Sequence, residues 1–206
     1  MVSPDVATAD VTAASTVRVE QSAGLNGRAA IYTRSGDRGE TDLADGPRVP
    51  KNAARLQVCG DLDELNSWFG LVRCEPLPDD TAKLLECIQR RLFDLGDEIV
   101  TVAADHGRNA IGPQDVEALE QVIDRCEANM KPLDVFLLPG GTRAASMLHV
   151  ARAVCRRAER NLVALLDGEP TAVSPSLQAY VNRLSDLLFV LARLANHRAS
   201  VGETSW

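Results

Sequence analysis

Apolar residues recur at helical spacing through most of this chain, from about residue 53 to residue 198. A period near 3.6 gives each helix one apolar face, and that face must be buried against another helix. Aromatic residues make up only 4% of the chain, whereas Ala, Leu and Arg are abundant. This composition favours packed helices over sheets of aromatic and β-branched residues. We therefore expect an all-α fold.

Helix-breaking and helix-capping residues divide the pattern into five predicted helices. We expect them at about 53–74, 79–102, 113–126, 143–167 and 175–198. The start signals are capping or first-turn residues, namely Asp79, Asp80, Pro113, Thr142, Ser174 and Pro175. Gly168 is expected to end the fourth helix in the αL conformation. Short connections between the helices predict a five-helix bundle.

The ends of the chain differ in composition from the helical region. Residues 1–28 are rich in Ala, Ser, Thr and Val, and we expect them to form a disordered tail. Residues 29–198 should form one helical-bundle domain, followed by a C-terminal tail at 199–206. Within the domain, residues 30–50 contain too many Gly, Pro, Asp and Thr residues for a regular helix, which predicts a structured loop or a loop with a short strand.

Charge and cysteine content exclude several classes of protein. The formal net charge of −7 argues against general nucleic-acid binding, which requires a basic face. The five cysteines are odd in number and widely spaced, and the three histidines are isolated, so reduced thiols are expected and a zinc site is not. No apolar run reaches membrane-spanning length, and the start lacks the pattern of a secretion signal. We expect a cytoplasmic protein that binds neither nucleic acid nor membrane.

A stripe of arginines interrupts the apolar pattern of the fourth predicted helix. Arg152, Arg156 and Arg160 follow one another at i+4 steps, and Glu159 lies close to Arg156. Charges in an apolar surrounding are costly unless they are paired. The stripe therefore predicts a polyphosphate site or a subunit interface. Arg157 lies one step around the helix and is the best candidate for a merely solvated arginine.

A second polar stripe lies on the fifth predicted helix, where Asn182, Asp186 and Arg193 share a face. This stripe can face the arginines of the preceding helix. The alternative is a surface ladder of salt bridges that includes Glu159 and Asp186. The two explanations stay open on these residues alone.

Three further segments carry candidate groups. The loop T-R-S-G-D-R-G-E-T at 33–41 offers backbone N–H groups, hydroxyls and guanidiniums to phosphates, although it lacks the P-loop pattern and can be an ordinary polar turn. In G-D-L-D-E-L-N-S-W at 60–68, an acid can pair with an arginine of the fourth helix or belong to a solvated face. Phe136 precedes a P-G-G turn and can be a simple hydrophobic staple. His149 is more typical of a packed core histidine than of a ligand.

Taken in order, five motifs resemble one family. They are I-Y-T-R-S-G-D-R-G-E-T, G-D-L-D-E-L-N-S, F-L-L-P-G-G-T, H-V-A-R-A-V-C-R-R-A-E-R and V-N-R-L-S-D-L-L-F-V-L-A-R. The chain is similar to the ATP:cob(I)alamin adenosyltransferases of the propanediol-utilisation type over about residues 30–198. Each motif is weak singly, but five in order with compatible spacing are specific.

This resemblance implies a ferritin-like, up-and-down bundle with an N-terminal nucleotide-binding loop. It also implies a homotrimer with active sites between subunits. The implied transferase moves the adenosyl group of ATP, with Mg²⁺, to the Co(I) centre of cobalamin and passes adenosylcobalamin to a dependent enzyme such as a mutase. The alternative is a non-catalytic escort of the same fold that binds cobalamin and nucleotide. A purely structural helical oligomer is a more distant possibility.

The resemblance also assigns nucleotide-binding roles to Thr33, Arg34, Ser35, Gly36, Arg38, Thr41, Asp42, Lys51, Arg156, Glu159, Arg160 and Asn182. The candidate nucleotide-binding set further includes Asp37, Gly39, Arg157 and Asp186. Within it, Glu159 is the expected Mg²⁺ ligand. The residues expected to act in catalysis are Arg156, Phe136, Asp63 and Arg152. Asp63 and Arg152 would form a salt bridge between subunits, and Phe136 would cover the lower face of the corrin ring.

Overall fold

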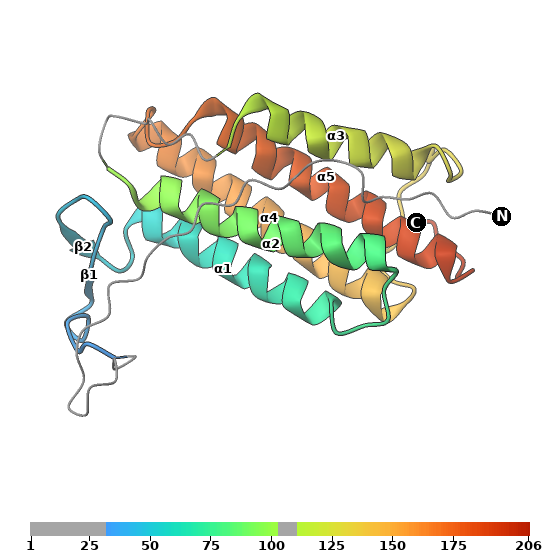
Figure 1. Cartoon of the computed structure of the whole chain (residues 1–206), viewed down its shortest axis with the longest axis horizontal. Coiled ribbons are helices and arrows are strands. Elements are labelled where there is room, and N and C mark those ends of the chain that lie inside the picture. Colours follow the sequence, from blue (N-terminus) through green and yellow to red (C-terminus); the bar gives the residue numbers. More distant parts are fainter. Residues whose placement is uncertain (1–31, 103–110) are drawn as a thin grey trace.

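The computed structural model describes residues 32–102 and 111–206, so the tail expected at residues 1–28 lies outside the described residues. Within the described ranges the chain forms five α-helices and one short hairpin (Figure 1). The helices are α1 (Ala54–Val72), α2 (Asp79–Val100), α3 (Pro113–Glu127), α4 (Arg143–Gly168) and α5 (Pro175–Arg198). The strands β1 (Glu40–Asp42) and β2 (Arg48–Pro50) pair antiparallel. The predicted five-helix bundle is confirmed, with this small sheet inside the predicted loop.

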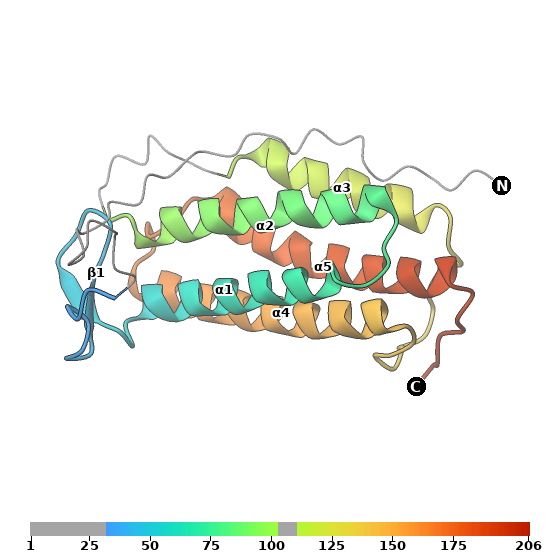
Figure 2. The ribbon, with the colours of Figure 1, turned by 60° about the horizontal axis from the view of Figure 1, so that its bottom comes forward.

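Successive helices run in opposite directions, so the described connections lie at two ends of the bundle (Figure 2). α4 packs against both α1 and α5, while α2 packs on α1 and α3 on α5. The hairpin end holds β1, β2, the start of α1 and the α4–α5 connection. The opposite end, here called the C-terminal end, holds the α1–α2 connection, the loop at 131–142 and the last residues of the chain. This up-and-down order decides which candidate groups can meet.

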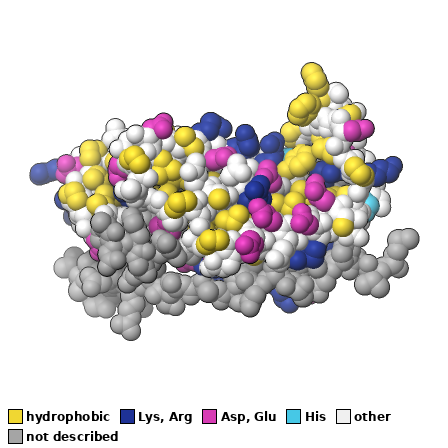
Figure 3. All heavy atoms as spheres, turned by 90° about the horizontal axis from the view of Figure 1, so that it is seen from above, with side chains coloured by type: hydrophobic (Ala, Val, Ile, Leu, Met, Phe, Trp, Pro, Cys, Tyr) yellow, Lys and Arg dark blue, Asp and Glu magenta, His cyan; other side chains and the backbone are white. Residues whose placement is uncertain are grey.

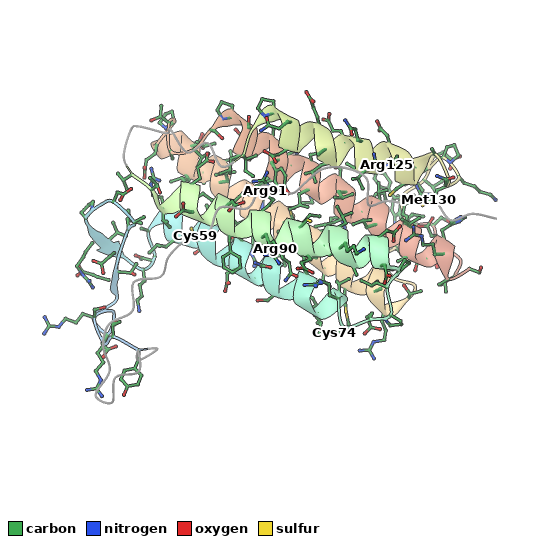
Figure 4. All side chains as sticks on the ribbon, viewed as in Figure 1. Cys59, Cys74, Arg90, Arg91, Arg125 and Met130 are labelled. Atoms are coloured by element: carbon green, nitrogen blue, oxygen red, sulfur yellow. The ribbon has the colours of Figure 1, made fainter. Side chains whose placement is uncertain are left out.

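The interior is built mainly from aliphatic side chains, as the periodicity predicts. The largest fully buried residues include Leu65, Phe69, Leu85, Ile88, Leu95, Leu162 and Tyr180. One buried ionic cluster joins α2 to α3, where Arg91 contacts Asp115 at 2.5 Å and Asp94 at 3.2 Å (Figure 4). Each buried charge in this cluster therefore has a counter-charge.

Two of the predicted helix starts are confirmed by capping hydrogen bonds. The Thr142 hydroxyl accepts from the Ala145 N–H at 3.1 Å, and the Ser174 hydroxyl accepts from the Leu177 N–H at 3.2 Å. These bonds satisfy backbone donors that have no partner inside the helix. Pro113 and Pro175 occupy first-turn positions, as predicted.

The predicted caps at Asp79 and Asp80 and the predicted terminator Gly168 are wrong. Pro78 is the N-cap of α2, and both aspartates lie in its first turn, where a negative charge favours the helix dipole. Gly168 is the last residue of α4 and does not adopt a positive φ. The Glu169 N–H bonds the Leu165 carbonyl oxygen at 2.8 Å, so the helix ends without an αL residue.

The two ends of the described chain are tied to the bundle. At the hairpin end, Leu43 is buried and the Ala44 N–H donates to the Val100 carbonyl oxygen at 3.3 Å. At the C-terminal end, the tail expected at 199–206 returns along the loop at 131–142. The Leu138 N–H donates to Thr204 and the Trp206 N–H donates to Phe136, both at 2.8 Å. The tail is therefore a part of the C-terminal end.

All five cysteines lie within the described residues, and none forms a disulfide. Burial raises the pKa of the Cys59 and Cys126 thiols to about 11, which keeps both protonated near neutral pH. None of the described helices is both long and apolar enough to cross a bilayer.

Candidate functional site

An arginine outside the predicted motif holds the loop that precedes and includes the hairpin. Arg48 on β2 donates to the Asp42 carboxylate at 2.9 Å and to the Ser35 carbonyl oxygen at 2.8 Å. It also donates to the Glu40 carbonyl oxygen at 3.2 Å. Asp42, expected in the nucleotide-binding set, is thus engaged by Arg48. Sequence reasoning missed Arg48 because its contacts depend on the register of the hairpin.

The cationic and hydroxyl groups of this loop remain exposed. The Thr33 and Ser35 hydroxyls lie 2.7 Å apart, and the Arg34 guanidinium carbon lies 5.4 Å from the centre of the Tyr32 ring. The Lys51 amine lies so close to Gly36 that a Cβ there would stand 2.8 Å from Nζ. Hydroxyls and cations on one exposed loop suit the recognition of phosphates.

The two predicted stripes on α4 and α5 meet at one hydrogen bond. The Asn182 Nδ2 donates to Glu159 Oε1 at 2.7 Å, and Glu159 Oε2 lies 4.0 Å from Arg156 Nη1. Arg160 donates to the Arg156 carbonyl oxygen at 3.1 Å. The side chain of Arg156 is half exposed, while that of Glu159 is 20% exposed. The amide of Asn182, the carboxylate of Glu159 and the guanidinium of Arg156 thus come together from two motifs.

A pocket of about 580 Å³ adjoins this group between α3, α4 and α5. Arg152 and Arg156 line it from α4, and Arg183, Asp186 and Phe189 line it from α5. The α3 wall is acidic, with Glu120, Asp124 and Glu127. In the space-filling view of Figure 3, acidic and basic side chains lie among hydrophobic ones on one face of the molecule. A pocket of this kind can hold a ligand with both charged and apolar parts.

Arg152 is poorly satisfied in this pocket. Its Nε is buried and has no hydrogen-bond partner in the described part of the chain, and its guanidinium carbon lies 6.0 Å from the centre of the Phe189 ring. Burial lowers the pKa of Arg152, and the nearby Arg156 lowers it further. A buried donor without an acceptor is costly, so this Nε is a candidate to bind a group from outside the chain.

Asp186 is paired within its own helix rather than with the arginine stripe. Arg183 donates to Asp186 at 3.0 Å and to Glu120 of α3 at 2.9 Å. Sequence reasoning missed Arg183, Glu120 and Phe189. The one available signal was the i,i+3 spacing of Arg183 and Asp186.

Arg157 is not the merely solvated arginine that the sequence suggested. It contacts Asp61 at 2.9 Å and also Glu64, both on α1, and Asn161 donates to Asp61 at 2.5 Å. Two acids of the G-D-L-D-E-L motif thus bind an arginine of α4 inside one chain. The presence of Arg157 in the nucleotide-binding set stays a prediction.

Asp63 is exposed on α1 and has no ion pair with Arg152 in the described part of the chain. The reason is that the two arginines lie on different sides of α4: Arg157 points to α1, and Arg152 points to the pocket beside α5. Both side chains are therefore available to a neighbouring chain. Their expected pairing between subunits stays a prediction.

The expected site residues do not gather at one place in a single chain. The loop with Arg34 and Lys51 lies at the hairpin end, and the loop at 131–142, which carries Phe136, lies at the C-terminal end (Figure 1). Phe136 is 79% exposed. The 19 residues of α1 alone separate these ends by about 28 Å. Arg156 lies between them. No hydrogen bond or ion pair among residues 32–102 and 111–206 joins the loop to Arg156, Glu159 or Asn182.

Comparison with known proteins gives one consistent family. A family model described as cobalamin adenosyltransferase matches residues 31–195. The cobalamin adenosyltransferase of Cupriavidus metallidurans is 45% identical over 177 residues, which cover 85% of this chain and 93% of that protein. The corrinoid adenosyltransferase PduO of Salmonella typhimurium is 42% identical over 177 residues, which cover 84% of this chain and 52% of that protein.

Solved structures give the same result. A variant PduO-type ATP:corrinoid adenosyltransferase from Lactobacillus reuteri, complexed with cobalamin and ATP, superposes with a TM-score of 0.80 at 35% identity. The match covers 86% of this chain and 99% of that one. A second variant of the same type, complexed with ATP, gives a TM-score of 0.79 at 37% identity over 85% of this chain and 99% of that one.

Proposed function

We propose, since this chain belongs to the cobalamin adenosyltransferase family, that it transfers the adenosyl group of ATP to the Co(I) centre of reduced cobalamin. The electron pair of Co(I) forms a bond to the ribose methylene carbon, and the carbon–oxygen bond to triphosphate breaks. The products are adenosylcobalamin and triphosphate. The single observation that carries the residue assignment is the Glu159–Asn182 hydrogen bond beside Arg156.

The chemistry explains why the candidate site has guanidiniums and no acid–base set. The nucleophile is the cobalt of the substrate, so no protein base is needed. The protein has to align the two substrates and stabilise the charge that develops on the leaving triphosphate. Arg156 is half exposed beside Glu159 and is free to contact a phosphate, and Arg160 lies one turn further along α4.

Phe136 has a separate role in this proposal. Reduction of Co(II) to Co(I) is unfavourable while an axial ligand stays on the cobalt, and an apolar ring on that face excludes such a ligand. The exposed ring of Phe136 is available for this contact. The two Lactobacillus reuteri variants carry substitutions of a phenylalanine and an arginine 20 residues apart, which is also the spacing of Phe136 and Arg156.

Glu159 fits the expected role as a ligand of Mg²⁺ that arrives with ATP. The described residues contain no group of three or more His, Cys, Asp or Glu side chains that could hold a metal ion. Mg²⁺ commonly binds one or two carboxylates together with substrate phosphates and water. Glu159 offers one carboxylate, oriented by Asn182 and adjacent to Arg156. In this role Mg²⁺ would neutralise phosphate charge.

The separation of the candidate groups supports a site between subunits. The loop with Arg34 and Lys51 and the group around Arg156 lie at different levels of one chain, and Arg152 lacks a partner for its buried Nε. A homotrimer would place the loop of one subunit against α4 and α5 of the next, and Asp63 could then reach Arg152. A dependent mutase would receive the product, and the five unbridged cysteines support a cytoplasmic location.

The activity is tested with purified protein, ATP, Mg²⁺ and chemically reduced cobalamin. We expect the absorbance change of adenosylcobalamin formation in the wild type. Arg156→Ala should lower kcat by about 100-fold, as expected when a transition-state charge loses its partner, with cobalamin binding largely kept. Arg90→Ala removes an exposed arginine of α2 and serves as the matched control. A wild type that binds cobalamin without turnover would instead support the escort.

The shared site is tested by mixing two variants that are each defective. Lys51→Ala damages the loop, and Arg156→Ala damages the α4 group. If each site takes its loop from one subunit and α4 from another, mixed oligomers contain some intact sites, and activity should return after joint refolding. Mixtures that stay as inactive as their components would contradict the proposed arrangement.

A further inference from the structure

The position of Phe136 depends on its backbone rather than on packing of its ring. The side chain is 79% exposed, and its neighbours Val135 and Leu138 are exposed as well. Hydrophobic side chains project from one end of the molecule in the space-filling view (Figure 3). An exposed ring has few contacts that could fix it, so the bonds of the flanking backbone decide where it lies.

Asn196 on α5 holds the backbone after Phe136. Its Oδ1 accepts from the Thr142 N–H at 2.9 Å, and its Nδ2 donates to the Gly140 carbonyl oxygen at 3.0 Å. The side chain is buried, with 3% of its surface exposed. Gly141 lies between the two bonds with φ +104°, and a Cβ on it would overlap the Asn196 amide. The P-G-G turn is therefore fitted closely around this amide.

A second connection to Phe136 runs through the C-terminal tail and begins at the main chain of Asn196. Its carbonyl oxygen accepts from the Val201 N–H at 2.9 Å, where the chain turns after α5. The tail then runs back to Trp206, whose N–H donates to the Phe136 carbonyl oxygen at 2.8 Å. The segment from Phe136 to Gly140 is thus fixed at both borders, and both connections begin at Asn196.

A second buried polar residue, Arg193, supports the same arrangement three positions earlier on α5. It donates to the Lys131 carbonyl oxygen at 2.9 Å and pairs with Glu203 of the tail at 3.3 Å. Buried polar groups are stable only when they are bonded, and these two direct their bonds to the loop at 131–142 and to the tail. This face of α5 is therefore specialised for holding the loop.

We propose that Asn196 is a positioning residue for Phe136 and acts through it on the Co(II)-to-Co(I) step. This inference rests on the proposed adenosyl transfer and adds a residue that does not touch either substrate. Loss of the Asn196 bonds leaves the Thr142 N–H and the Gly140 carbonyl unpaired and frees the turn. The Phe136 ring then occupies its place on the corrin face for a smaller fraction of the time.

The test uses Asn196→Asp, which is nearly isosteric. Its carboxylate can accept from Thr142 but cannot donate to Gly140. We expect turnover that starts from Co(II) cobalamin with a reductant to fall at least about tenfold, and turnover that starts from pre-reduced Co(I) to fall less than about threefold. The four-coordinate signature of Co(II) cobalamin with ATP should weaken in parallel. Asn129→Asp, in an exposed loop, is the control and should leave both assays unchanged.

A double-mutant cycle separates positioning from general damage to the fold. In a Phe136→Ala background, Asn196→Asp should have no further effect on turnover from Co(II). Equal losses in the two assays, or full additivity with Phe136→Ala, would overturn the proposal. If Asn196→Asp fails to fold, Arg193→Lys is tested instead. The lysine keeps a positive charge beside Glu203 but cannot make both contacts of the guanidinium, to Glu203 and to the Lys131 carbonyl oxygen. A wild type without turnover would refute the proposed function instead.

Discussion

The hairpin end and the C-terminal end each present a loop with candidate site residues, but they hold these loops in opposite ways. Arg48 holds the loop at the hairpin end through exposed bonds to Asp42 and Ser35. At the C-terminal end, the buried side chains of Arg193 and Asn196 hold their loop through partly buried bonds to Lys131, Gly140 and Thr142.

The difference teaches what each loop is built to do. Exposed hydrogen bonds and ion pairs compete with water and contribute little, so a loop held by them can rearrange around a ligand. Buried polar bonds are costly to break, so a loop held by them keeps one geometry. The first arrangement suits the capture of a flexible polyphosphate. The second suits an aromatic ring that has to stay on one face of a rigid corrin.

The largest expected effect is at the glycine of the buried turn. Gly141→Ala puts a Cβ into the Asn196 amide and a side chain at φ +104°, and we expect a loss of about 3 kcal/mol in unfolding free energy. Gly39→Ala has a similar φ of +82° but open space around it, and should cost about 1 kcal/mol. Denaturant unfolding measures both. Equal costs would mean that the two ends are held equally tightly.

The next effect is on nucleotide affinity at the hairpin end. Arg48→Ala removes the bonds to Asp42 and Ser35, and we expect the Kd for ATP to rise about fivefold, since exposed bonds are worth about 1 kcal/mol together. The thermal midpoint should hardly change, because the loop is outside the core. Calorimetric titration gives the Kd. Arg48→Lys keeps the charge but loses the planar guanidinium that donates to several acceptors. Wild-type affinity for ATP in that variant would show that the charge alone matters.

The smallest effect concerns pH at the C-terminal end. Burial lowers the pKa of His149 from 6.5, Arg152 lowers it further, and Glu203 opposes both. The unfolded chain then binds a proton more readily, so this contribution to stability is lost as pH falls from about 7 through the lowered pKa of the folded protein. His149→Gln should reduce the stability difference between pH 7.5 and 5.5 by less than about 1 kcal/mol.

Urea unfolding at the two pH values measures this difference. Exposed His197→Gln is the matched control and should leave it unchanged. If the unfolding free energy depends on pH identically in the wild type and His149→Gln, protonation of His149 does not contribute to that dependence.

Much of the fold was predictable from local patterns. Helix periodicity placed all five helices within a few residues, and Thr142 and Ser174 cap the helices they were expected to cap. The predictions for the helix ends at Asp79, Asp80 and Gly168 were wrong. Two of these ends also have partners far away in the sequence: Asp80 bonds Arg198 of α5 at 2.9 Å, and Glu169, the residue after Gly168, bonds Arg55 of α1 at 2.7 Å. Local capping rules take no account of such partners.

The candidate site was predictable only where its residues lie close in sequence. Arg156, Glu159 and Arg160 follow from helical spacing, and the motif order led to Asn182. Arg48, Arg183 and Asn196 carry ordinary residue types for their positions and gave no comparable signal. Their roles depend on partners that lie 13, 63 and 54 to 56 residues away in the chain.

By itself the sequence determined the helices, the motif order and the chemistry of the candidate groups, because periodicity, capping and residue type act over one or two turns. Only the tertiary structure decided which arginine points where. It turned Arg157 to α1, left the Arg152 Nε without a hydrogen-bond partner in the described part of the chain and put the phosphate loop and Phe136 at opposite ends. The physical reason is that α4 touches α1 and α5 on different sides, so neighbouring arginines face different surroundings.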